Sequence, residues 1–287
     1  MKRAKVFGLA MVFWASLICV CTLRAQDPVN LIYESYSKLT PLKGLPQEIS
    51  MDKATQVQKA LVEMLQKDYG KPVGYKAGLT NLKAQEAFGV KEPVLGVLLE
   101  KMLLKSGAKL KALFGARPVT EGDLIVRVGD EKINTAKTPE EAMAFIDQII
   151  PFIELPDLIY APDVKMNGPM IVAINVGARL GVMGEPISVQ NPTEWIERLR
   201  GFKLTMLNEK EEVIAEGSGS ALMGDPLKVV LWIRDALKAR GTSLKKGDLL
   251  SLGSITKMMP PQPNSVLKAR YLELDPKGAL EVKVQFE

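Results

Sequence analysis

The hydrophobic positions near the start of the chain recur with helical spacing. Apolar side chains lie three or four residues apart, on one face of a helix, at Ala54, Val57, Leu61, Met64 and Leu65. Ser50 is a suitable N-cap and Gly70 a suitable stop, so a helix is predicted from about Ser50 to Tyr69. A shorter helix is predicted over residues 28–38. We interpret the apolar face as core packing.

The second half of the chain shows short apolar runs that are separated by turn residues. Strands are predicted at residues 124–128, 246–250, 266–274 and 280–286. A capping box at Thr138 predicts a helix that runs to about Ile150, and Asp225-Pro226 begins another that ends near Arg240. Residues 170–182 are apolar and interrupted by glycine, which predicts a strand followed by a turn.

This order of elements predicts the fold class. Helices come first, and mixed strands with two inserted helices follow, which is typical of a single α+β domain. We expect a mainly helical N-terminal region over residues 26–115. A β-rich core over residues 116–287 would then hold any metal-binding and catalytic site. No internal repeat and no low-complexity tract interrupts this organisation.

The first 25 residues have the layout of a secretory signal peptide. Lys2, Arg3 and Lys5 precede an uncharged, mostly apolar run from Val6 to Cys21, and a polar stretch ends at Ala25. The run is shorter than the roughly 20 residues of a membrane-spanning helix. We therefore expect cleavage near Ala25, a secreted or periplasmic protein, and no stable membrane insertion after cleavage.

Loss of this segment changes what the composition implies. It carries four basic residues and no acids, so the formal net charge falls by four, from +5 to +1, which gives no basis for nucleic-acid binding. Both cysteines lie within it, so the mature chain has no disulfide. The chain contains no histidine, which excludes Ser-His-Asp catalysis and histidine-ligated zinc.

Three acids at the ends of apolar runs are candidate metal ligands. Glu121 and Asp123 are one residue apart where a predicted strand begins, so both side chains would point to one side of it. Glu154 ends the run Ile149 to Leu155. Carboxylate oxygens are the ligands that Mg²⁺ prefers, and a cation would offset the repulsion between neighbouring acids. The alternative is an ordinary solvated turn before a strand.

Lys76 is a candidate for contact with a ligand. It lies in a short segment between Gly74 and Gly78, where the backbone can approach a bound molecule closely. The alternative is a surface lysine whose aliphatic stem packs on the protein. The glycine- and serine-rich stretch at residues 216–220 matches neither common phosphate-binding motif and is interpreted as a tight turn.

Four blocks together resemble the 2-keto-4-pentenoate hydratase and 4-oxalocrotonate decarboxylase family of the fumarylacetoacetate hydrolase-like superfamily. They are Gly74-Tyr-Lys-Ala-Gly-Leu-Thr80 with residues 89–98, Glu121-Gly-Asp123, Glu154 after Ile150-Pro151, and the C-terminal blocks at 217–226, 240–241 and 246–248. The resemblance covers nearly the whole mature chain. It implies a fumarylacetoacetate hydrolase-type mixed β-sheet core with a helical N-terminal region.

The resemblance also implies a chemistry. Glu121, Asp123 and Glu154 would ligate Mg²⁺ or Mn²⁺, and Lys76 would be catalytic beside the substrate. Asn175 and Ser218 would bind substrate, a small 2-keto or 2-hydroxydienoic acid. The metal would act as a Lewis acid on the C2 oxygen and stabilise the enolate that forms. Ketonisation would then give a conjugated acceptor to which water adds, and in the decarboxylase variant loss of CO₂ would form the enolate. The resemblance further implies a homo-oligomer.

Several positions depart from the family pattern. Asp123 stands where the family commonly has glutamate, Ile174 where it often has aspartate, and Leu252 where threonine is usual. Three functions therefore remain open. The first is a metal-dependent lyase of the hydratase or decarboxylase type. The second is an acylpyruvate hydrolase that cleaves a C–C bond, and the third is a secreted, non-enzymatic binding protein.

Overall fold

A computed structural model describes residues 27–287 of the chain, and the predicted signal peptide lies outside these residues. Its α-helices are α1 (Pro28–Lys38), α2 (Met51–Tyr69), α3 (Leu82–Phe88), α4 (Pro139–Met143), α5 (Gly168–Ala173), α6 (Pro192–Gly201) and α7 (Pro226–Ala239). Its strands are β1 (Pro72–Gly78), β2 (Val94–Leu99), β3 (Leu103–Lys105), β4 (Ala108–Leu110), β5 (Glu121–Val128), β6 (Ile146–Leu155), β7 (Leu180–Met183), β8 (Ile187–Ser188), β9 (Lys203–Leu207), β10 (Val213–Ser218), β11 (Leu249–Ser251), β12 (Ser265–Asp275) and β13 (Gly278–Phe286).

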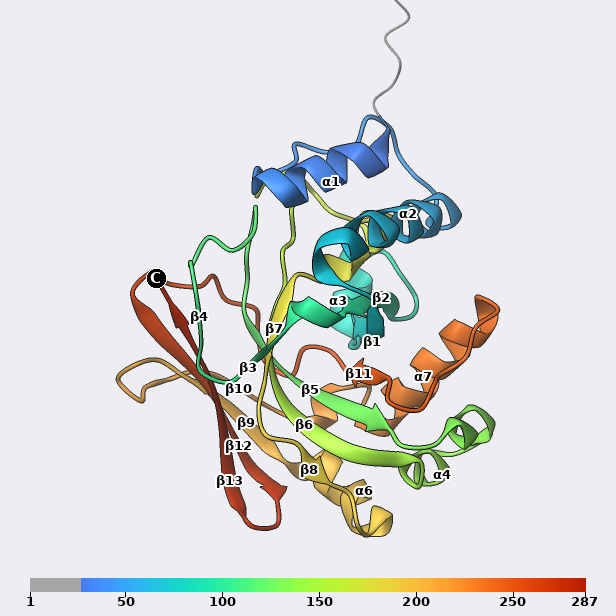
Figure 1. Cartoon of the computed structure of the whole chain (residues 1–287), viewed down its shortest axis with the longest axis vertical. Coiled ribbons are helices and arrows are strands. Elements are labelled where there is room, and N and C mark those ends of the chain that lie inside the picture. Colours follow the sequence, from blue (N-terminus) through green and yellow to red (C-terminus); the bar gives the residue numbers. More distant parts are fainter. Residues whose placement is uncertain (1–26) are drawn as a thin grey trace, which may run out of the picture.

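The strands form two mixed sheets. The larger runs β2-β1-β11-β5-β6-β7-β3, with β8 paired to β6, and the smaller runs β10-β9-β12-β13-β4. Neighbours are mostly antiparallel, but β1–β11, β3–β7 and β4–β13 are parallel. Figure 1 shows α1 and α2 together at one end, with the smaller sheet and α7 on opposite sides of β5 and β6. The predicted α+β fold with a mixed-sheet core is confirmed.

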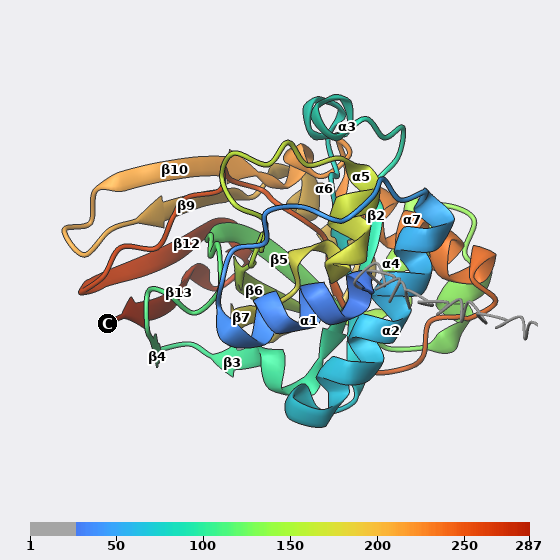
Figure 2. The same cartoon turned by 90° about the horizontal axis from the view of Figure 1, so that it is seen from above.

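The hydrophobic core surrounds β5 and β6. Seven of the eight residues of β5 are buried, including Leu124, Ile125 and Val126, so this strand is covered on both faces. A buried strand of this kind is a near-continuous apolar run rather than an alternating one. A second apolar cluster lies beneath α1 and α2, where α2 packs on α5. Figure 2 shows α1 and α2 side by side over this part of the fold.

Tyr271 joins the two sheets. It lies on β12 and is fully buried, and the single proton of its hydroxyl is shared between the carbonyl oxygens of Asp123 at 2.5 Å and Phe152 at 2.8 Å. The same hydroxyl accepts from the backbone N–H of Phe152 at 2.9 Å. Buried polar groups must find partners inside the protein. This hydroxyl therefore fixes β5 and β6 to the smaller sheet next to the candidate acids.

Two predictions of secondary structure were wrong. Thr138 does cap a helix, since its hydroxyl accepts from the N–H of Glu141 at 3.2 Å, but α4 ends at Met143 rather than near Ile150. The following residues pair with β5 as strand β6, because that pairing buries their branched side chains. Residues 170–182 begin as helix α5, which Asn167 caps, and become a strand only at β7.

Other predicted elements are confirmed, except that the strand predicted at residues 246–250 is observed only as β11, after a turn at residues 246–247. Helix α1 has the predicted bounds, α2 is capped by Ser50 and closed by Gly70, and α7 begins after Asp225. Residues 26–115 hold α1, α2 and α3, but they also supply β1 and β2 to the larger sheet. The sheet therefore continues across residue 115, and the domain division at that residue stays a prediction.

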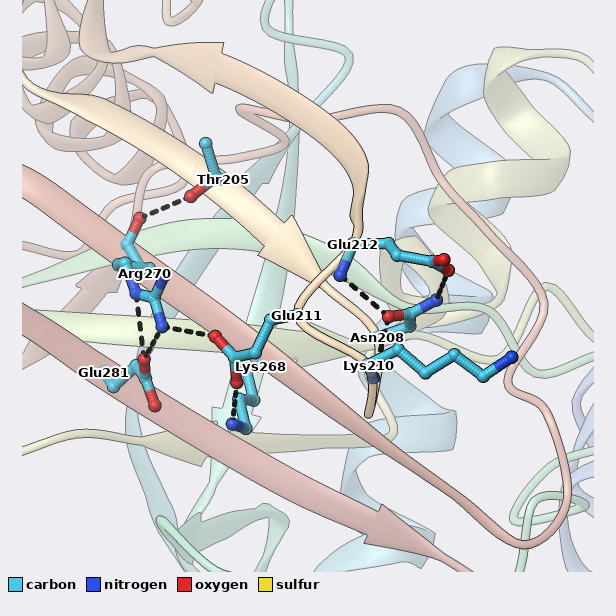
Figure 3. A network of polar contacts seen from close by, with 8 residues as sticks. All are labelled: Thr205, Asn208, Lys210, Glu211, Glu212, Lys268, Arg270 and Glu281. Atoms are coloured by element: carbon cyan, nitrogen blue, oxygen red, sulfur yellow. Dashed lines mark hydrogen bonds and ion pairs between the residues drawn. The ribbon is translucent and has the colours of Figure 1, made fainter.

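The solvent-facing side of the smaller sheet carries a network of ion pairs, which Figure 3 shows in detail. Arg270 donates to Glu211 at 2.6 Å and to Glu281 at 2.9 Å, and Lys268 is paired with Glu211. These side chains are partly exposed, and exposed ion pairs contribute little to stability. We assign the network to the surface of the sheet.

None of the helices within residues 27–287 has the length and apolar character needed to cross a membrane.

Candidate active site

The register of β5 and β6 brings the three candidate acids together. Glu121 lies directly opposite Glu154, and Asp123 lies two residues further along β5. Residues directly opposite each other, and residues i and i+2 of one strand, share a face of the sheet. Glu121 is 3% exposed, Asp123 0% and Glu154 2%. The alternative of a solvated turn is therefore wrong, because the three carboxyl groups are buried neighbours.

Burial and mutual repulsion make these acids unusual. Burial raises the pKa of Glu121 well above its ordinary value, and the negative charge of Glu154 raises it further. The pKa of Asp123 is raised to about 8, first by burial and then by Glu154. Desolvation and like charges both disfavour the ionised form of a carboxyl group. Full ionisation of all three therefore needs additional positive charge.

Lys76 supplies part of that charge. It lies on β1, is 3% exposed, and its ammonium group forms an ion pair with Oε1 of Glu154. The same group donates to the carbonyl oxygen of Val176 at 2.9 Å. Gly96 lies opposite Lys76 on β2, and a Cβ there would come within 2.8 Å of the lysine Cγ. The alternative of a surface lysine is wrong, and the missing side chain of Gly96 makes room for the buried stem.

Two serines that the sequence analysis did not identify hold the acids. Ser251 on β11 donates to Oδ2 of Asp123, and Ser254 donates to Oε2 of Glu121 at 2.5 Å. Oδ1 of Asp123 accepts from the backbone N–H groups of Leu124 at 2.5 Å and Gly253 at 2.9 Å. The pairing of β11 with β5 brings Ser251 close to Asp123. The N–H of Ile255 donates to the carbonyl oxygen of Gly122 at 2.9 Å, which keeps Ser254 beside Glu121. No local sequence signal indicated their role.

The donor set fits a divalent cation in charge and in type. Three carboxyl groups against one ammonium leave two negative charges uncompensated when all are ionised. Oε2 of Glu154 is buried and has no hydrogen-bond partner among residues 27–287, which is costly unless a cation or proton meets it. Hard cations such as Mg²⁺ bind such carboxylate oxygens.

The remaining contacts of these acids bear on the metal assignment. Within residues 27–287, no three acidic, histidine or cysteine side chains are arranged to hold one metal ion between them. In this arrangement Lys76 occupies one oxygen of Glu154, and three donors occupy Asp123. Convergence of Glu121, Asp123 and Glu154 on one ion stays a prediction.

The two predicted substrate-binding residues lie in different environments. Asn175 is fully buried, and its amide bonds to the backbone N–H and C=O of Val97 at 2.8 and 2.9 Å. Those contacts leave its side chain engaged with the protein, so they give no support to substrate binding. Ser218 ends β10 and shares a hydrogen bond of 2.8 Å with Ser220. Both substrate-binding roles stay predictions.

A cleft of about 1130 Å³ lies beside the acids, although Glu121, Asp123 and Glu154 do not themselves line it. Ser254, whose hydroxyl contacts Glu121, lines it, together with Thr80, Ser220 and Thr256. Three lysines also line the cleft, at positions 83, 91 and 257, against a single acid, Glu92. This excess of positive charge attracts small anions into the cleft. Ser254 is thus the contact between this positively charged cleft and the buried carboxyl groups.

Two of the three positions that depart from the pattern of the family that the sequence resembles lie in the hydrophobic core. Ile174 is 1% exposed and Leu252 is fully buried. The backbone N–H of Leu252 donates to the carbonyl oxygen of Leu124 at 3.0 Å, which continues the contact between the strand that contains Asp123 and the segment after β11. Both side chains pack against apolar neighbours and present no polar group. The two substitutions therefore remove polar groups without opening the core.

Comparison with known proteins supports the resemblance seen in the sequence. No family model matches the chain. The sequence is 24% identical over 259 residues to a 2-keto-4-pentenoate hydratase of Paraburkholderia xenovorans strain LB400, covering 88% of this chain and 90% of that protein.

Solved structures share the fold. The 4-oxalocrotonate decarboxylase of Pseudomonas putida G7, solved with magnesium and adipate, aligns with a TM-score of 0.78 and 24% identity, over 91% of this chain and 96% of its own. The fumarylpyruvate hydrolase of Pseudomonas aeruginosa, solved with Mn²⁺ and pyruvate, aligns with a TM-score of 0.51 and 12% identity, over 74% and 89%. The predicted resemblance is confirmed, and the fold is that of the fumarylacetoacetate hydrolase type, since a putative fumarylacetoacetate isomerase/hydrolase of Oleispira antarctica also aligns with a TM-score of 0.51 at 14% identity, over 76% of this chain and 96% of its own.

Proposed function

We propose that this protein is a metal-dependent lyase that hydrates or decarboxylates a small 2-keto or 2-hydroxydienoic acid. One observation carries the proposal: Glu121 and Glu154 face each other beside the buried ammonium group of Lys76, next to a lysine-lined cleft. Two of the similar proteins are named as enzymes of this kind, the 2-keto-4-pentenoate hydratase of Paraburkholderia xenovorans and the 4-oxalocrotonate decarboxylase of Pseudomonas putida G7. One of them was solved with magnesium, which supports a divalent metal here.

The acids would provide the metal site. Glu121, Asp123 and Glu154 would hold Mg²⁺ or Mn²⁺, which when bound supplies a Lewis acid for the carboxylate and C2 oxygen of the substrate. Ser251 and Ser254 orient two of these acids through the hydrogen bonds described above. Fixed ligands of this kind need no rearrangement during the reaction, which is how preorganised sites lower a barrier.

Lys76 would be the catalytic residue of this chain. Its ammonium group is buried, so its charge acts in surroundings of low polarity where electrostatic effects are strong. Negative charge develops on the C2 oxygen of a 2-keto acid when the neighbouring carbon loses a proton or CO₂. A lysine beside that oxygen stabilises the charge chiefly in the transition state, which raises the rate constant rather than binding alone.

The cleft would admit the substrate. Its three lysines attract the carboxylate of a keto acid, and its apolar lining residues, among them Trp232 and Ile255, suit a short unsaturated carbon chain. Pockets for small ligands commonly combine apolar walls with a few polar groups.

A second function in the same superfamily is a hydrolase that cleaves the C–C bond of an acylpyruvate. Its support is the shared fold with fumarylpyruvate hydrolase, and fold alone does not determine a reaction. A non-enzymatic binding role has no support from the site or from the similar proteins. Homo-oligomer formation and export to the periplasm or beyond remain part of the proposal and rest on the sequence.

The test is turnover of a panel of 2-keto acids by the purified protein, with and without Mg²⁺. The panel holds 2-hydroxydienoic acids, an oxalocrotonate-type acid and acylpyruvates, and product analysis separates hydration, decarboxylation and C–C cleavage. We expect turnover of a dienoic or oxalocrotonate-type acid that a chelator abolishes. Preference for acylpyruvates would favour the hydrolase, and inactivity on the whole panel with Mg²⁺ present would refute the enzymatic proposal.

A further inference from the structure

A chain of hydrogen bonds connects helix α2 to the short segment Asn175–Gly177, whose Val176 carbonyl accepts from Lys76. Gln58 on α2 is 2% exposed, and its Nε2 donates to the carbonyl oxygen of Leu95 at 2.6 Å and to Oδ1 of Asn175 at 3.3 Å. Its Oε1 accepts from Arg240 at 3.0 Å. An arginine can only donate, so this contact fixes which end of the Gln58 amide faces Asn175.

Asn175 continues the chain. Its Oδ1 accepts from the N–H of Val97 and its Nδ2 donates to the carbonyl oxygen of the same residue, at 2.8 and 2.9 Å. One side-chain amide thus pairs with both polar groups of a residue on β2, as a neighbouring strand would. Gln58 adds a second donor to Oδ1 and bonds to Leu95 on the same strand. The two amides together fix the position of residue 175.

The backbone at this point is strained. Asn175 and Val176 have φ angles of 54° and 55°, in the left-handed region that a β-branched residue such as Val176 rarely adopts. Such a conformation persists only where the surroundings hold it. Gly78 and Gly96 provide space, since a Cβ at either would lie 2.4 and 3.2 Å from side-chain atoms of Val176.

The strained segment presents one group to the site. The carbonyl oxygen of Val176 accepts from the ammonium group of Lys76 at 2.9 Å. The other acceptor of that group is Oε1 of Glu154, one of the predicted metal ligands. The Val176 carbonyl is thus an acceptor for Lys76 that is not itself a predicted metal ligand, so it can orient the ammonium group whether or not a cation is bound.

We propose that Gln58 and Asn175 are positioning residues that hold the Val176 carbonyl as an anchor for Lys76. The inference rests on the proposed function for its catalytic meaning, but the positioning itself can be measured without any substrate. In this proposal Asn175 acts on the site through the backbone that follows it.

The experiment compares Gln58→Met with Val62→Ala. Methionine keeps the unbranched stem of residue 58 and removes its donors and acceptor. Val62 lies on the same helix, is 7% exposed, and belongs to the core beneath α2, so its truncation lowers stability without touching the amide chain. Two quantities are measured at a temperature well below unfolding: the rate at which an amine-reactive acylating reagent labels Lys76, followed by mass spectrometry, and kcat with KM.

We expect Gln58→Met to label faster at Lys76 than the wild type, while Val62→Ala labels at the wild-type rate. We also expect kcat to fall about ten-fold or more with KM nearly unchanged, because a displacement of about 1 Å can cost on the order of 10²-fold in rate. Gln58→Glu is the second variant if methionine prevents folding. It keeps an acceptor for Arg240, lacks the donor to Asn175, and should change the labelling in the same direction.

Equal labelling and equal kcat in the Gln58 variants and Val62→Ala would overturn the proposal. Faster labelling in a protein that turns over no 2-keto acid would support the positioning role and refute the proposed function instead. Failure of the positioning role and failure of the proposed lyase function therefore give different results.

Discussion

Glu121 on β5 and Glu154 on β6 are register partners, and both are buried. Antiparallel partners are the closest neighbours that two strands offer, so two carboxyl groups have been placed where their repulsion is strongest. Such an arrangement destabilises a fold unless a proton or a cation compensates it. With Asp123 nearby there are three carboxyl groups, and Lys76 compensates one of their charges. The two that remain when all three are ionised are the physical reason to expect a divalent ion.

Metal binding should stabilise the folded protein. A ligand that binds only the folded state adds RT ln(1 + [L]/Kd), about 2.7 kcal/mol at one hundred times Kd. We expect millimolar Mg²⁺ to raise the melting temperature of the wild type, and Glu154→Gln to lose most of that rise. Glu63→Gln, an exposed site on α2, is the matched control and should respond as the wild type does. No shift with Mg²⁺ in the wild type would contradict the metal site.

The metal-free protein should lose stability as the pH rises. The pKa of Asp123 is about 8 in the folded protein against 3.8 ordinarily, because of burial and then the charge of Glu154. Between these values the folded state keeps a proton that the unfolded state releases. The resulting stability is complete below about pH 4 and is lost progressively up to about pH 8.

The measurement is the unfolding free energy in chelator from pH 5 to 8, in the wild type and in Asp123→Asn. The asparagine variant has no proton to lose at this position and should show a shallower slope. Saturating Mg²⁺ should also flatten the wild-type curve, because a cation replaces the proton. A wild-type curve that rises over this range in chelator would show that the raised pKa is wrong.

Tyr271→Phe should destabilise the protein and disturb the metal site together. The hydroxyl serves the carbonyl oxygens of Asp123 and Phe152 and the N–H of Phe152, so its removal leaves buried groups without a partner. Each such loss costs about 1–3 kcal/mol. We expect an unfolding free energy lower by roughly that amount and a weaker response to Mg²⁺. The control is Tyr33→Phe, at a partly exposed position on α1, and an equal response to Mg²⁺ in both variants would argue against the link.

Much of the fold could be predicted because its signals are local. Ser50 and Gly70 mark the ends of α2 within their own neighbourhood, and the structure follows them. The end of α4 could not be predicted in this way. The signal at Thr138 that starts the helix is local. The helix ends because the residues after it pair with β5 as strand β6, and β5 lies earlier in the chain, so no local signal marks that end.

The site was predictable in part for the same reason. Glu121, Asp123 and Lys76 were found from local pattern and family resemblance, but their burial depends on the assembled sheet. Ser251 lies 128 residues from Asp123 in sequence, and only the pairing of β11 with β5 brings the two into contact. The same holds for Gln58 and Asn175, which are 117 residues apart. The sequence contains no signal for such pairs.

Export is testable without any knowledge of the reaction. The basic, apolar and polar order of the first 25 residues predicts cleavage near Ala25. Expression of the full chain followed by fractionation and N-terminal sequencing should give a mature protein that starts near Gln26. Replacement of Lys2, Arg3 and Lys5 by glutamine should slow export, because it removes the basic start of the signal. Intact Met1 on cytoplasmic protein from the unaltered chain would contradict the prediction.

Lys76→Met separates catalysis from metal binding. Methionine keeps an unbranched stem in the space beside Gly96 and removes the charge. Metal affinity should be unchanged or higher, because Oε1 of Glu154 is released from its ion pair and a positive charge no longer opposes the cation. Turnover should fall by about 10²–10³, the typical cost of one lost electrostatic contact in a preorganised site.

The matched control for this last variant is Lys59→Met, an exposed position on α2 that should leave both quantities at wild-type values. Metal affinity is read from the Mg²⁺ dependence of the melting temperature, and turnover from kcat on the best substrate of the panel. A loss of both in Lys76→Met would indicate that the lysine maintains the fold of the acids. Retention of near-full kcat would remove Lys76 from the catalytic residues, because a charge that acts on the transition state cannot be deleted without a change in rate.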